Sequence, residues 1–349
     1  MAKRKKKSAK KAVRRPNLLS ADSSSHSQNN GSGPRHRMLT ERLFSRRLAA
    51  VDIGSNAIRM ILAEQNDSNI HILERFRFPI RLGADVFKDG KLSAKTIRNA
   101  AKTFKEFSKL ANRFRVRSIL AVGTSALREA KNSGAFIKAI KKSSSIHVKI
   151  IDGVEEARLV HLAVKNQVRL NRQKALLIDV GGGSIELTFS ENGLMNATQS
   201  FPYGTVRTLQ FLKSQDLKEA DLEMVLEEFL GPLNHFISSQ RRMIKPRIAI
   251  GTGGNIESLA RLKTKLLNSN DHEEISLIEL EEIIARLREL KIKDRIKKLN
   301  LRPDRADVIV PAGLLIHAAL SRAGIQSIQV PHVGLKEGLL WQLANRNWK

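Results

Sequence analysis

Two stretches of the chain share one pattern of apolar and polar positions. Each starts as an apolar, β-prone run, passes through a glycine-containing turn and returns as a second apolar run, at 50–64 (AVDIGSNAIRMILAE) and 177–191 (LIDVGGGSIELTFSE). Turn-forming residues end both stretches, NDSN at 66–69 and ENG at 191–193, so each stretch predicts a β-hairpin. The alternation along the runs is imperfect, as is typical of strands buried on both faces of an α/β sheet.

Amphipathic segments that follow the hairpins predict helices. Ser93 is the expected N-cap of a helix that runs to about residue 114, and Ser276 with Glu279 forms a capping box at the start of another helix. The most apolar stretch, 308–320, is too short to span a bilayer and contains a proline and a histidine. We therefore expect it to form a buried strand and helix.

The two hairpins belong to a longer duplication. Asp52 aligns with Asp179, an offset of 127 residues, and a second pair of glycine loops, VGTSALRE ending at 129 and IGTGGNIES ending at 258, aligns Gly123 with Gly251 at an offset of 128. Two separate loops that recur in the same order at nearly one spacing indicate two homologous α/β halves. Such halves are expected to face each other across a cleft.

The glycine loops are candidate phosphate sites. Glycine lets backbone N–H groups converge on an anion without interference from Cβ atoms, and the loop that contains Gly253 and Gly254 precedes a predicted helix, whose N-terminus favours phosphate. The alternative is that all of these loops are ordinary turns. The chain contains neither a P-loop motif nor a dinucleotide-binding GxGxxG after a strand.

Carboxylates beside these loops suggest a cation. Asp52 and Asp179 each precede a glycine turn and suit Mg²⁺, which takes a few protein oxygens together with water and substrate phosphate. Glu186 lies on the strand that leaves the second turn, where it is either a further cation ligand or a solvent-facing residue of an edge strand.

A further acidic pair opens a predicted helix at DGVEEARLV. Glu155 and Glu156 are adjacent, so they point in different directions around the helix start. One can complement the helix dipole, and the other can face the cleft as a general base for water. Arg128 either neutralises phosphate charge or forms a structural salt bridge.

Charge and composition narrow the class of protein. The chain of 349 residues carries a net charge of +28 and no cysteine, which excludes disulfides, thiolate metal sites and cysteine nucleophiles. Residues 1–47 hold 14 Lys or Arg and two Asp or Glu, so +12 of this charge lies in an N-terminal segment that we expect to be a disordered basic tail. A basic chain attracts polyanions. We expect a cytoplasmic protein without a secretory signal or membrane contact, whose tail touches polyanions or nucleic acid non-specifically.

The motifs VDIGSNAIRM, VGTSALREAKN, GVEEARL, IDVGGGSIEL, IGTGGNIESLARL and VGLKEGLL resemble, in order and spacing, the exopolyphosphatase/guanosine pentaphosphatase (Ppx/GppA) family. The resemblance implies an α/β fold of two duplicated ribonuclease H-like domains of the actin/Hsp70/sugar kinase superfamily, with the active site in the interdomain cleft. It implies domain I at 48–172 plus a returning helix at 334–349, and domain II at 173–333. Nothing remains after residue 349 for the additional domains of longer members, so we expect the short, two-domain form.

The resemblance also implies an activity. Family members release terminal orthophosphate from polyphosphate, or the 5′-γ-phosphate from guanosine pentaphosphate, by in-line attack of water with Mg²⁺; Mn²⁺ is a second candidate cation. By motif position, Glu156 is the expected base, Arg128 a catalytic arginine, and Asp179 and Glu186 metal ligands. Together with the glycine loops, the motifs assign phosphate binding to Gly54, Ser55, Asn56, Gly181, Gly182, Gly183, Ser184, Gly253 and Gly254. Many members carry Ser or Thr at the position of Ala57.

Two other functions remain open at this level. One is an ATP-dependent kinase or ATPase of the same superfamily. The other is a non-catalytic polyphosphate- or nucleic-acid-binding regulator, although the aromatic content of 5% supplies few stacking platforms for bases. The assembly is expected to be a monomer or a homodimer.

Overall fold

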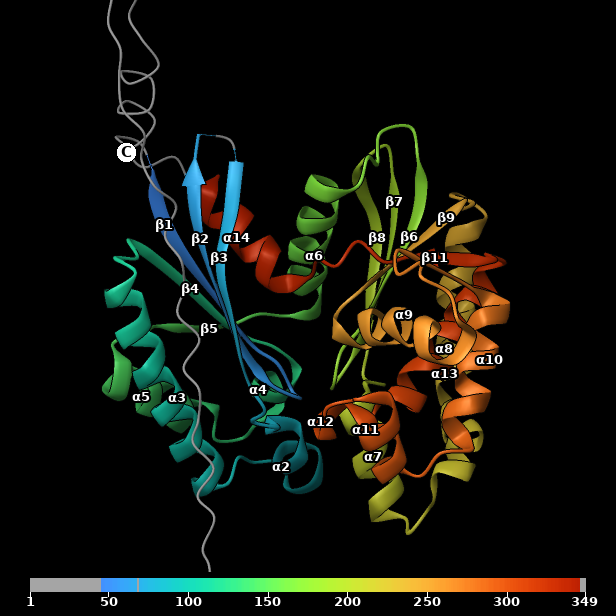
Figure 1. The fold of residues 1–349 in the computed structure, drawn as a ribbon, viewed down its shortest axis with the longest axis horizontal. Helices are drawn as coiled ribbons and strands as arrows, with labels where there is room; N and C mark the ends of the chain where they lie inside the picture. The colour runs from blue at the N-terminus through green and yellow to red at the C-terminus, as the bar shows by residue number, and fades with distance from the viewer. Residues whose placement is uncertain (1–44, 68, 346–349) are drawn as a thin grey trace, which may run out of the picture. The chain divides into compact units, whose positions relative to one another are not determined.

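The computed structural model describes residues 45–67 and 69–345, which form two mixed β-sheets covered by helices (Figure 1). Strand β1 begins at Arg46. The basic tail predicted for the N-terminus lies, up to residue 44, outside the described residues.

Sheet A and the helices around it come first in the chain. Their bounds are β1 (Arg46–Ile53), β2 (Ile58–Asn66), β3 (Asn69–Phe78), α2 (Leu82–Asp89), α3 (Ala94–Arg113), β4 (Ser118–Gly123), α4 (Ser125–Glu129), α5 (Ser133–Ser144), β5 (Val148–Ile150) and α6 (Gly153–Gln167).

Sheet B and the remaining helices follow. Their bounds are β6 (Lys174–Val180), β7 (Ile185–Glu191), β8 (Leu194–Phe201), α7 (Thr205–Ser214), the 3₁₀ turn η1 (Glu219–Asp221), α8 (Leu222–Arg241), β9 (Ile248–Thr252), α9 (Gly254–Leu267), β10 (Glu274–Ser276), α10 (Leu277–Arg288), α11 (Ile292–Leu299), α12 (Pro303–Ala306), α13 (Ile309–Ala323), β11 (Ser327–Gln329) and α14 (Leu335–Ala344).

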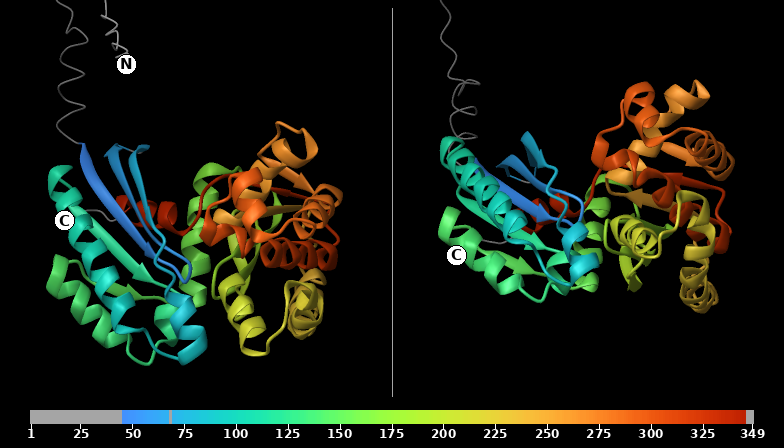
Figure 2. Two further views of the ribbon diagram at one scale, coloured as in Figure 1. Left: turned by 60° about the horizontal axis from the view of Figure 1, so that its bottom comes forward. Right: turned by 90° about the horizontal axis from the view of Figure 1, so that it is seen from below.

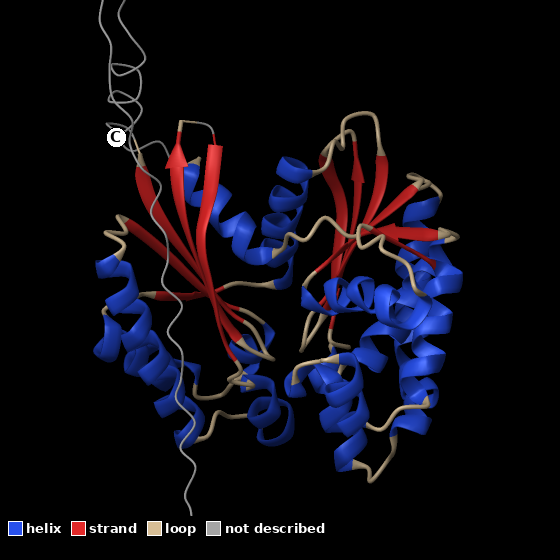
Figure 3. Ribbon diagram, viewed as in Figure 1, coloured by secondary structure: helices blue, strands red, loops and turns tan. Residues whose placement is uncertain are grey.

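The two sheets repeat one topology, which confirms the duplication. The strand order is β3-β2-β1-β4-β5 in sheet A and β8-β7-β6-β9-β11 in sheet B, where β10 adds a sixth strand beyond β11. In each sheet the first three strands are antiparallel and the next two join in parallel. This is the ribonuclease H-like arrangement expected from the sequence, and Figure 3 shows the strands in two separate groups with helices around each.

Alternation along β1 divides its side chains between two cores. Ala49, Val51 and Ile53 pack with residues of α3 and α5 on one face of sheet A. Leu48 and Ala50 pack on the other face with α6 and α14, and Figure 2 shows the same two layers of helices from further directions. Because successive strand residues point to opposite faces, Asp52 continues the face that meets α6 and α14.

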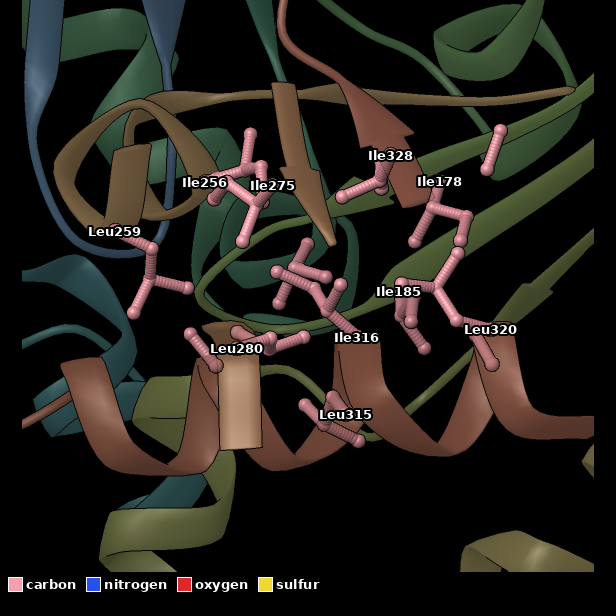
Figure 4. Close-up of a cluster of buried hydrophobic side chains, with 14 of the residues drawn as sticks. Ile178, Ile185, Ile256, Leu259, Ile275, Leu280, Leu315, Ile316, Leu320 and Ile328 are labelled. Carbon is pink, nitrogen blue, oxygen red and sulfur yellow. The ribbon is translucent and has the colours of Figure 1, made fainter. Parts of the chain in front are cut away.

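Sheet B repeats this division. Side chains of β6 and β7 that include Ile178 and Ile185 join the large core formed with α9, α10 and α13 (Figure 4). Ala175 and Leu177 face the other way and pack against α6 through Val164. Helix α6 therefore contacts the inner faces of both halves, and its first turn is held where the two sheets approach each other.

Several local predictions are confirmed. The side chain of Ser93 accepts a hydrogen bond from Thr96 N and caps α3, and Ser276 with Glu279 forms the predicted capping box of α10. Both hairpins form, and positive φ angles at Asn192 and Gly193 make the turn between β7 and β8.

The expectation for 308–320 is wrong in one respect. The stretch contains no strand, because α13 begins at Ile309 and Pro311 lies in its first turn, where a missing N–H costs no helical hydrogen bond. The segment Pro303–Ala323 is long and apolar enough to cross a membrane, yet 67% of its most apolar window is buried inside the protein. It is a core helix of the second half.

Candidate functional site

A cavity of about 450 Å³ lies where the loops of the two halves meet. The lining residues that bear on the chemistry come from both sheets and their loops and from α4, α6, α9, α12 and α14: Asp52, Gly54, Ser55, Asn56, Arg59, Arg75, Arg77, Thr124, Ser125, Glu156, Asp179, Gly181, Gly182, Ser184, Gly253, Gly254, Asn255, Glu257, Arg302, Arg305 and Lys336. The cavity therefore brings together eleven of the fourteen site residues predicted from the sequence. The other three, Gly183, Glu186 and Arg128, do not line it.

The two hairpin turns are built alike. Gly54 N donates to Ala57 O at 3.1 Å, and Gly181 N donates to Ser184 O at 3.0 Å, the equivalent bond 127 residues later. Ala57 itself is fully buried, whereas Ser184 lines the cavity. The two turns therefore share a backbone and differ in the hydroxyl that they offer.

The glycine run at 181–183 is required by close packing. None of its residues has a positive φ. A Cβ on Gly182 would lie 3.1 Å from Ser55 Cβ, and one on Gly183 would lie 2.0 Å from Ser125 Oγ and 2.5 Å from Phe87. The turn of sheet B thus presses directly against the first half. The interpretation that all three glycines bare N–H groups to phosphate is therefore incomplete, because Gly183 serves contact between the halves.

The loop before α9 also needs glycine, for a different reason. Gly253 has φ +87°, a left-handed conformation that side chains rarely adopt, and a Cβ there would come 2.7 Å from Asp179 Oδ1. Because Gly253 has no side chain, the start of α9 can lie against the Asp179 carboxylate. The carboxylate then stays open to the cavity.

The duplicated hairpins carry different cross-strand pairs. Asp52 lies opposite Arg59 across β1 and β2, and the guanidinium donates to Asp52 Oδ2 at 2.8 Å. The equivalent pair in sheet B is Asp179 opposite Glu186, where a second carboxylate replaces the arginine. Glu186 is 3% exposed and accepts a hydrogen bond from Ser200 Oγ at 2.7 Å. The solvent-facing alternative for Glu186 is therefore wrong.

These carboxylates share a poorly solvated region. Burial raises the pKa of Asp179 to about 6, with Asp52 acting in the same direction. Burial and then the charge of Asp179 raise the pKa of Glu186 to about 7. Both carboxyl groups are therefore harder to ionise than usual, and a bound cation would favour their ionised forms.

Glu156 completes this group from the first turn of α6. The helix is capped by Asp152, whose side chain accepts from Glu155 N at 2.8 Å. Glu156 is 8% exposed, and its Oε2 atom is buried without a hydrogen-bond partner. Burial, followed by the charges of Glu186 and Asp179, raises its pKa well above the ordinary value.

Arg128 lies beside Glu156 and opposes this effect. Its Nη1 atom is 3.6 Å from Glu156 Oε2 and donates to Ile151 O at 2.7 Å. The positive charge lowers the pKa of Glu156, although less than burial raises it. The backbone bond fixes the guanidinium close to the carboxylate, although Arg128 itself does not line the cavity.

The two adjacent glutamates have separate surroundings, as their different directions around the helix start predict. Glu155 pairs with Arg158, whose Nε donates at 2.6 Å, and this hydrogen bond lowers the pKa of Glu155. Glu156 faces the cavity. Only one of the pair is therefore available to a ligand in the cavity.

Sequence reasoning missed the basic part of the wall. Arg59, Arg75, Arg77, Arg302, Arg305 and Lys336 line the cavity and outnumber its carboxylates. Arg59 could have been found, because it occupies the duplicate position of Glu186. Arg302 and Arg305 belong to no glycine loop, so only the fold brings them to the site.

A bridge between the halves crosses one end of the cavity. Arg77 is ion-paired with Asp304, and Arg81 Nη1 lies 2.6 Å from Asp307 Oδ2. The side chain of Asn56 belongs to this bridge, since Nδ2 donates to Asp304 O at 2.9 Å and Oδ1 accepts from Arg81 Nε at 2.7 Å. The side-chain amide of Asn56 therefore joins the two halves. Its backbone is the part of the residue left for the phosphate binding predicted from the sequence.

The donor set fits a hard cation that brings its own further ligands. Within 45–67 and 69–345 no three acidic or histidine side chains converge tightly enough to hold a metal by themselves. Asp52 already accepts a hydrogen bond from Arg59, whereas Asp179 is half-buried and lines the cavity. Mg²⁺ commonly binds through one or two carboxylates plus water and phosphate, so the residues present fit it.

The fold and site place the chain among the duplicated ribonuclease H-like proteins of the actin/Hsp70/sugar kinase superfamily. Within that superfamily, the family model of the Ppx/GppA phosphatases matches residues 60–347, and the chain belongs to this family.

Individual relatives agree with the family assignment. The chain is similar to a crystal structure of an exopolyphosphatase from Cytophaga hutchinsonii, with a TM-score of 0.77 and 26% identity over 85% of this chain and 97% of that one. It is also similar to a Ppx/GppA family member from Aquifex aeolicus, with a TM-score of 0.72 and 25% identity over 87% of this chain and 100% of that one. Exopolyphosphatase 1 of Mycobacterium leprae is 24% identical over 299 residues, which are 84% of this chain and 88% of the relative.

Proposed function

We propose that the protein is a Mg²⁺-dependent phosphoanhydride hydrolase that releases terminal orthophosphate from inorganic polyphosphate in the cytoplasm. One observation carries the proposal: the Glu156 carboxylate is buried, has an oxygen without a hydrogen-bond partner, and faces a cavity lined by glycine turns and arginines. A buried acceptor of this kind needs a polar group from a ligand. Water bound beside the terminal phosphate supplies one.

Glu156 acts in this proposal as the general base. Burial raises its pKa, which makes the ionised carboxylate a stronger base toward water than an exposed glutamate. The water oxygen bonds to the terminal phosphorus as the bridging P–O bond breaks in line with it. The proton passes to Glu156, and the electron pair of the broken bond leaves on the shortened chain. Arg128, held by Ile151 O, acts in the direction that favours the ionised form of Glu156.

Asp179 would hold the cation, and Glu186 and Asp52 would supply further negative charge near it. A bound Mg²⁺ supplies charge neutralisation for the phosphate oxygens and for these carboxylates. The N–H groups of the turns at Gly54 and Gly181 and the hydroxyls of Ser55 and Ser184 orient the terminal phosphate from opposite halves. Holding the reacting groups in place from two sides is a large share of phosphoryl-transfer catalysis.

The cavity wall favours polyphosphate over guanosine pentaphosphate. Phe76 and the imidazole of His332 are the only aromatic rings among the described residues that line it, so a base would find little to stack on. The six basic side chains match a repeating polyanion. The family relationship supports the same choice through the relatives whose names specify exopolyphosphatase.

The test is a substrate panel with the purified full chain. Orthophosphate release is measured from polyphosphates of several lengths and from guanosine pentaphosphate, with and without Mg²⁺ and with and without ATP. The proposal predicts ATP-independent release that requires the cation, with the highest kcat/KM on polyphosphate. An absolute ATP requirement would indicate a kinase or ATPase, and binding without any release would indicate a regulator.

A further inference from the structure

Most of the net positive charge that follows the N-terminal tail lies in one segment of the first half. Residues 48–349 carry +16, and residues 91–150 alone hold 15 Lys or Arg and two Asp or Glu, a net charge of +13. These residues form α3, β4, α4, α5 and β5 with the loops between them. The rest of the chain from residue 48 onward is therefore nearly balanced in charge, at +3.

Two neighbouring helices of this segment carry basic side chains on their outer sides. Helices α3 and α5 pack together on sheet A (Figure 1) and bury Phe104, Phe107 and Phe136 against it. Their exposed basic side chains form what we call the α3–α5 surface: Lys95, Arg98, Lys102, Lys105, Lys109 and Arg113 of α3 and Lys138, Lys141 and Lys142 of α5.

The basic side chains of α3 form a row along the helix. They recur at intervals of three or four residues, the spacing that places side chains on one face of a helix. From Lys95 to Arg113 the row is about 27 Å long, since each helical residue rises roughly 1.5 Å. Like charges at this spacing destabilise a helix, so helix stability does not explain the row.

The protein neutralises almost none of this charge. Within 45–67 and 69–345, Lys109 is the only member of the α3–α5 surface with an ion pair, and its Nζ lies 2.9 Å from Glu106 Oε1. Both partners of that pair are exposed, where an ion pair contributes little. The surface therefore presents its charge to a partner of opposite sign.

The α3–α5 surface is separate from the cavity. No described residue of α3 or α5 lines the cavity. Both helices cover the face of sheet A opposite the one that packs against α6, whose first turn carries Glu156. A phosphate held beside Glu156 is therefore out of contact with these lysines and arginines.

The composition of the surface selects among polyanions. The large apolar side chains that are exposed in the described structure all lie outside residues 91–150, so a lipid bilayer would meet charge without a group to insert. The three phenylalanines of α3 and α5 are fully buried, which leaves no ring to stack on the bases of a single strand. A flexible chain such as polyphosphate loses conformational freedom when a straight row holds it. A stiff polyanion avoids that cost.

We propose that the α3–α5 surface binds double-helical nucleic acid through its phosphates, without reading the base sequence. A duplex has a persistence length of about 50 nm and carries one charge per roughly 1.7 Å of its axis, so the row meets a continuous line of phosphates. Lys and Arg donate hydrogen bonds to phosphate oxygens and release the counterions of the duplex. This binding goes beyond the hydrolase activity and leaves the cavity free.

The test compares the full-length protein with two full-length variants of equal net charge. R98Q/K102Q/K105Q removes three members of the α3 row that have no ion pair among the described residues. Glutamine forms helices about as well as lysine or arginine, and the change removes like-charge repulsion along α3, so the fold is kept. Thermal unfolding checks this point.

The matched control is R242Q/K245Q/K293Q. It removes three exposed charges of the second half, which also have no ion pair among the described residues and do not line the cavity. The N-terminal tail is present in all three proteins, so its own affinity for polyanions is common to them. Binding to labelled DNA and RNA duplexes of about 24 base pairs, longer than the α3 row, is measured by fluorescence anisotropy over a range of salt concentrations.

The α3 variant should bind the duplexes about tenfold more weakly or worse at about 0.1 M salt. The slope of log Kd against log salt should fall by about 2–3, as the loss of three phosphate contacts predicts. The control variant should stay within about threefold of wild type. Hydrolysis of tripolyphosphate should stay within about twofold in both variants, since none of the six side chains lines the cavity.

The outcomes are distinct. Equal binding by the three proteins would overturn the proposal, and equal weakening in both variants would reduce it to an effect of net charge and overturn it as well. A loss that appears only with long polyphosphate, or only with vesicles of anionic phospholipid, would assign the surface to another partner and contradict it. A loss with only one duplex would support it for that nucleic acid. A specific loss in a protein that hydrolyses no polyphosphate would support the surface and refute the proposed function.

Discussion

Asp179 and Glu186 lie directly opposite each other across β6 and β7, at the register position where the duplicated half pairs Asp52 with Arg59. Directly opposed like charges destabilise a sheet, and burial adds to that cost. The first half neutralises its aspartate internally, whereas the second half leaves two carboxylates for a ligand to neutralise. This asymmetry between otherwise equivalent hairpins is the reason why the proposed function assigns the cation to the second half.

The first prediction concerns stability in the absence of metal. The folded pKa of Asp179, about 6 against an ordinary 3.8, means that the protonated form is favoured by folding. The contribution of Asp179 to the free energy of unfolding is fully present below about pH 4 and is lost as pH rises through 6. The loss amounts to at most about 3 kcal/mol. D179N should therefore gain stability relative to wild type across this window, measured by urea unfolding in chelator-containing buffer at several pH values.

Asp85 provides a control of opposite sign. Although burial acts upward, hydrogen bonds from Thr96 and Ser93 hold its pKa below the ordinary value, so D85N should lose stability relative to wild type as pH rises. Added Mg²⁺ should stabilise wild type more than D179N at pH 8, since only a ligand of the folded state shifts unfolding. Parallel pH curves for wild type and D179N would contradict the account of this carboxylate.

The second prediction concerns Arg128 and the pH profile of activity. Arg128 is the cation that lowers the otherwise raised pKa of Glu156. Its removal in R128M should raise that pKa further, so the acid limb of kcat/KM should move to higher pH by about one unit or more. R128K keeps the charge and should move it less. An acid limb that stays in place in R128M would separate Arg128 from the ionisation of the base.

A third prediction tests the packing role of the glycine run. G183A places a Cβ 2.0 Å from Ser125 Oγ and 2.5 Å from Phe87, so we expect a loss of about 1–3 kcal/mol of unfolding free energy from overpacking. G134A is the matched control, because nothing lies within 4 Å of a Cβ there and the residue is helical; it should gain up to roughly 1 kcal/mol. Equal stabilities for the two variants would refute the packing interpretation.

The sequence predicted the fold class and most of the cavity because both depend on local, repeated signals. The aligned turns at Gly54 and Gly181 fixed two equivalent hairpins, and the structure confirms the duplicated topology. Helix geometry also predicted that Glu155 and Glu156 point in different directions, whereas the choice of Glu156 for the site came from the family motif. The domain boundaries and the roles of the site residues stay predictions.

Other features depend on contacts that no local pattern contains. The packing of Gly183 against Ser125 joins two halves of the chain. Arg305 reaches the cavity from a short helix that belongs to none of the glycine-loop motifs in the sequence. The side chain of Asn56 binds α12 for the same reason. Buried charge without a partner can be recognised only when every neighbour is known.

The central claim is that Glu156 is the base for hydrolysis, and a pair of isosteric variants tests it most directly. E156Q removes the base, whereas E155Q changes the adjacent, Arg158-paired glutamate that lies outside the cavity. On polyphosphate with Mg²⁺, kcat for E156Q should fall about 100-fold or more while E155Q stays within about twofold of wild type. Near wild-type orthophosphate release by E156Q, or an equal loss in both variants, would contradict the claim.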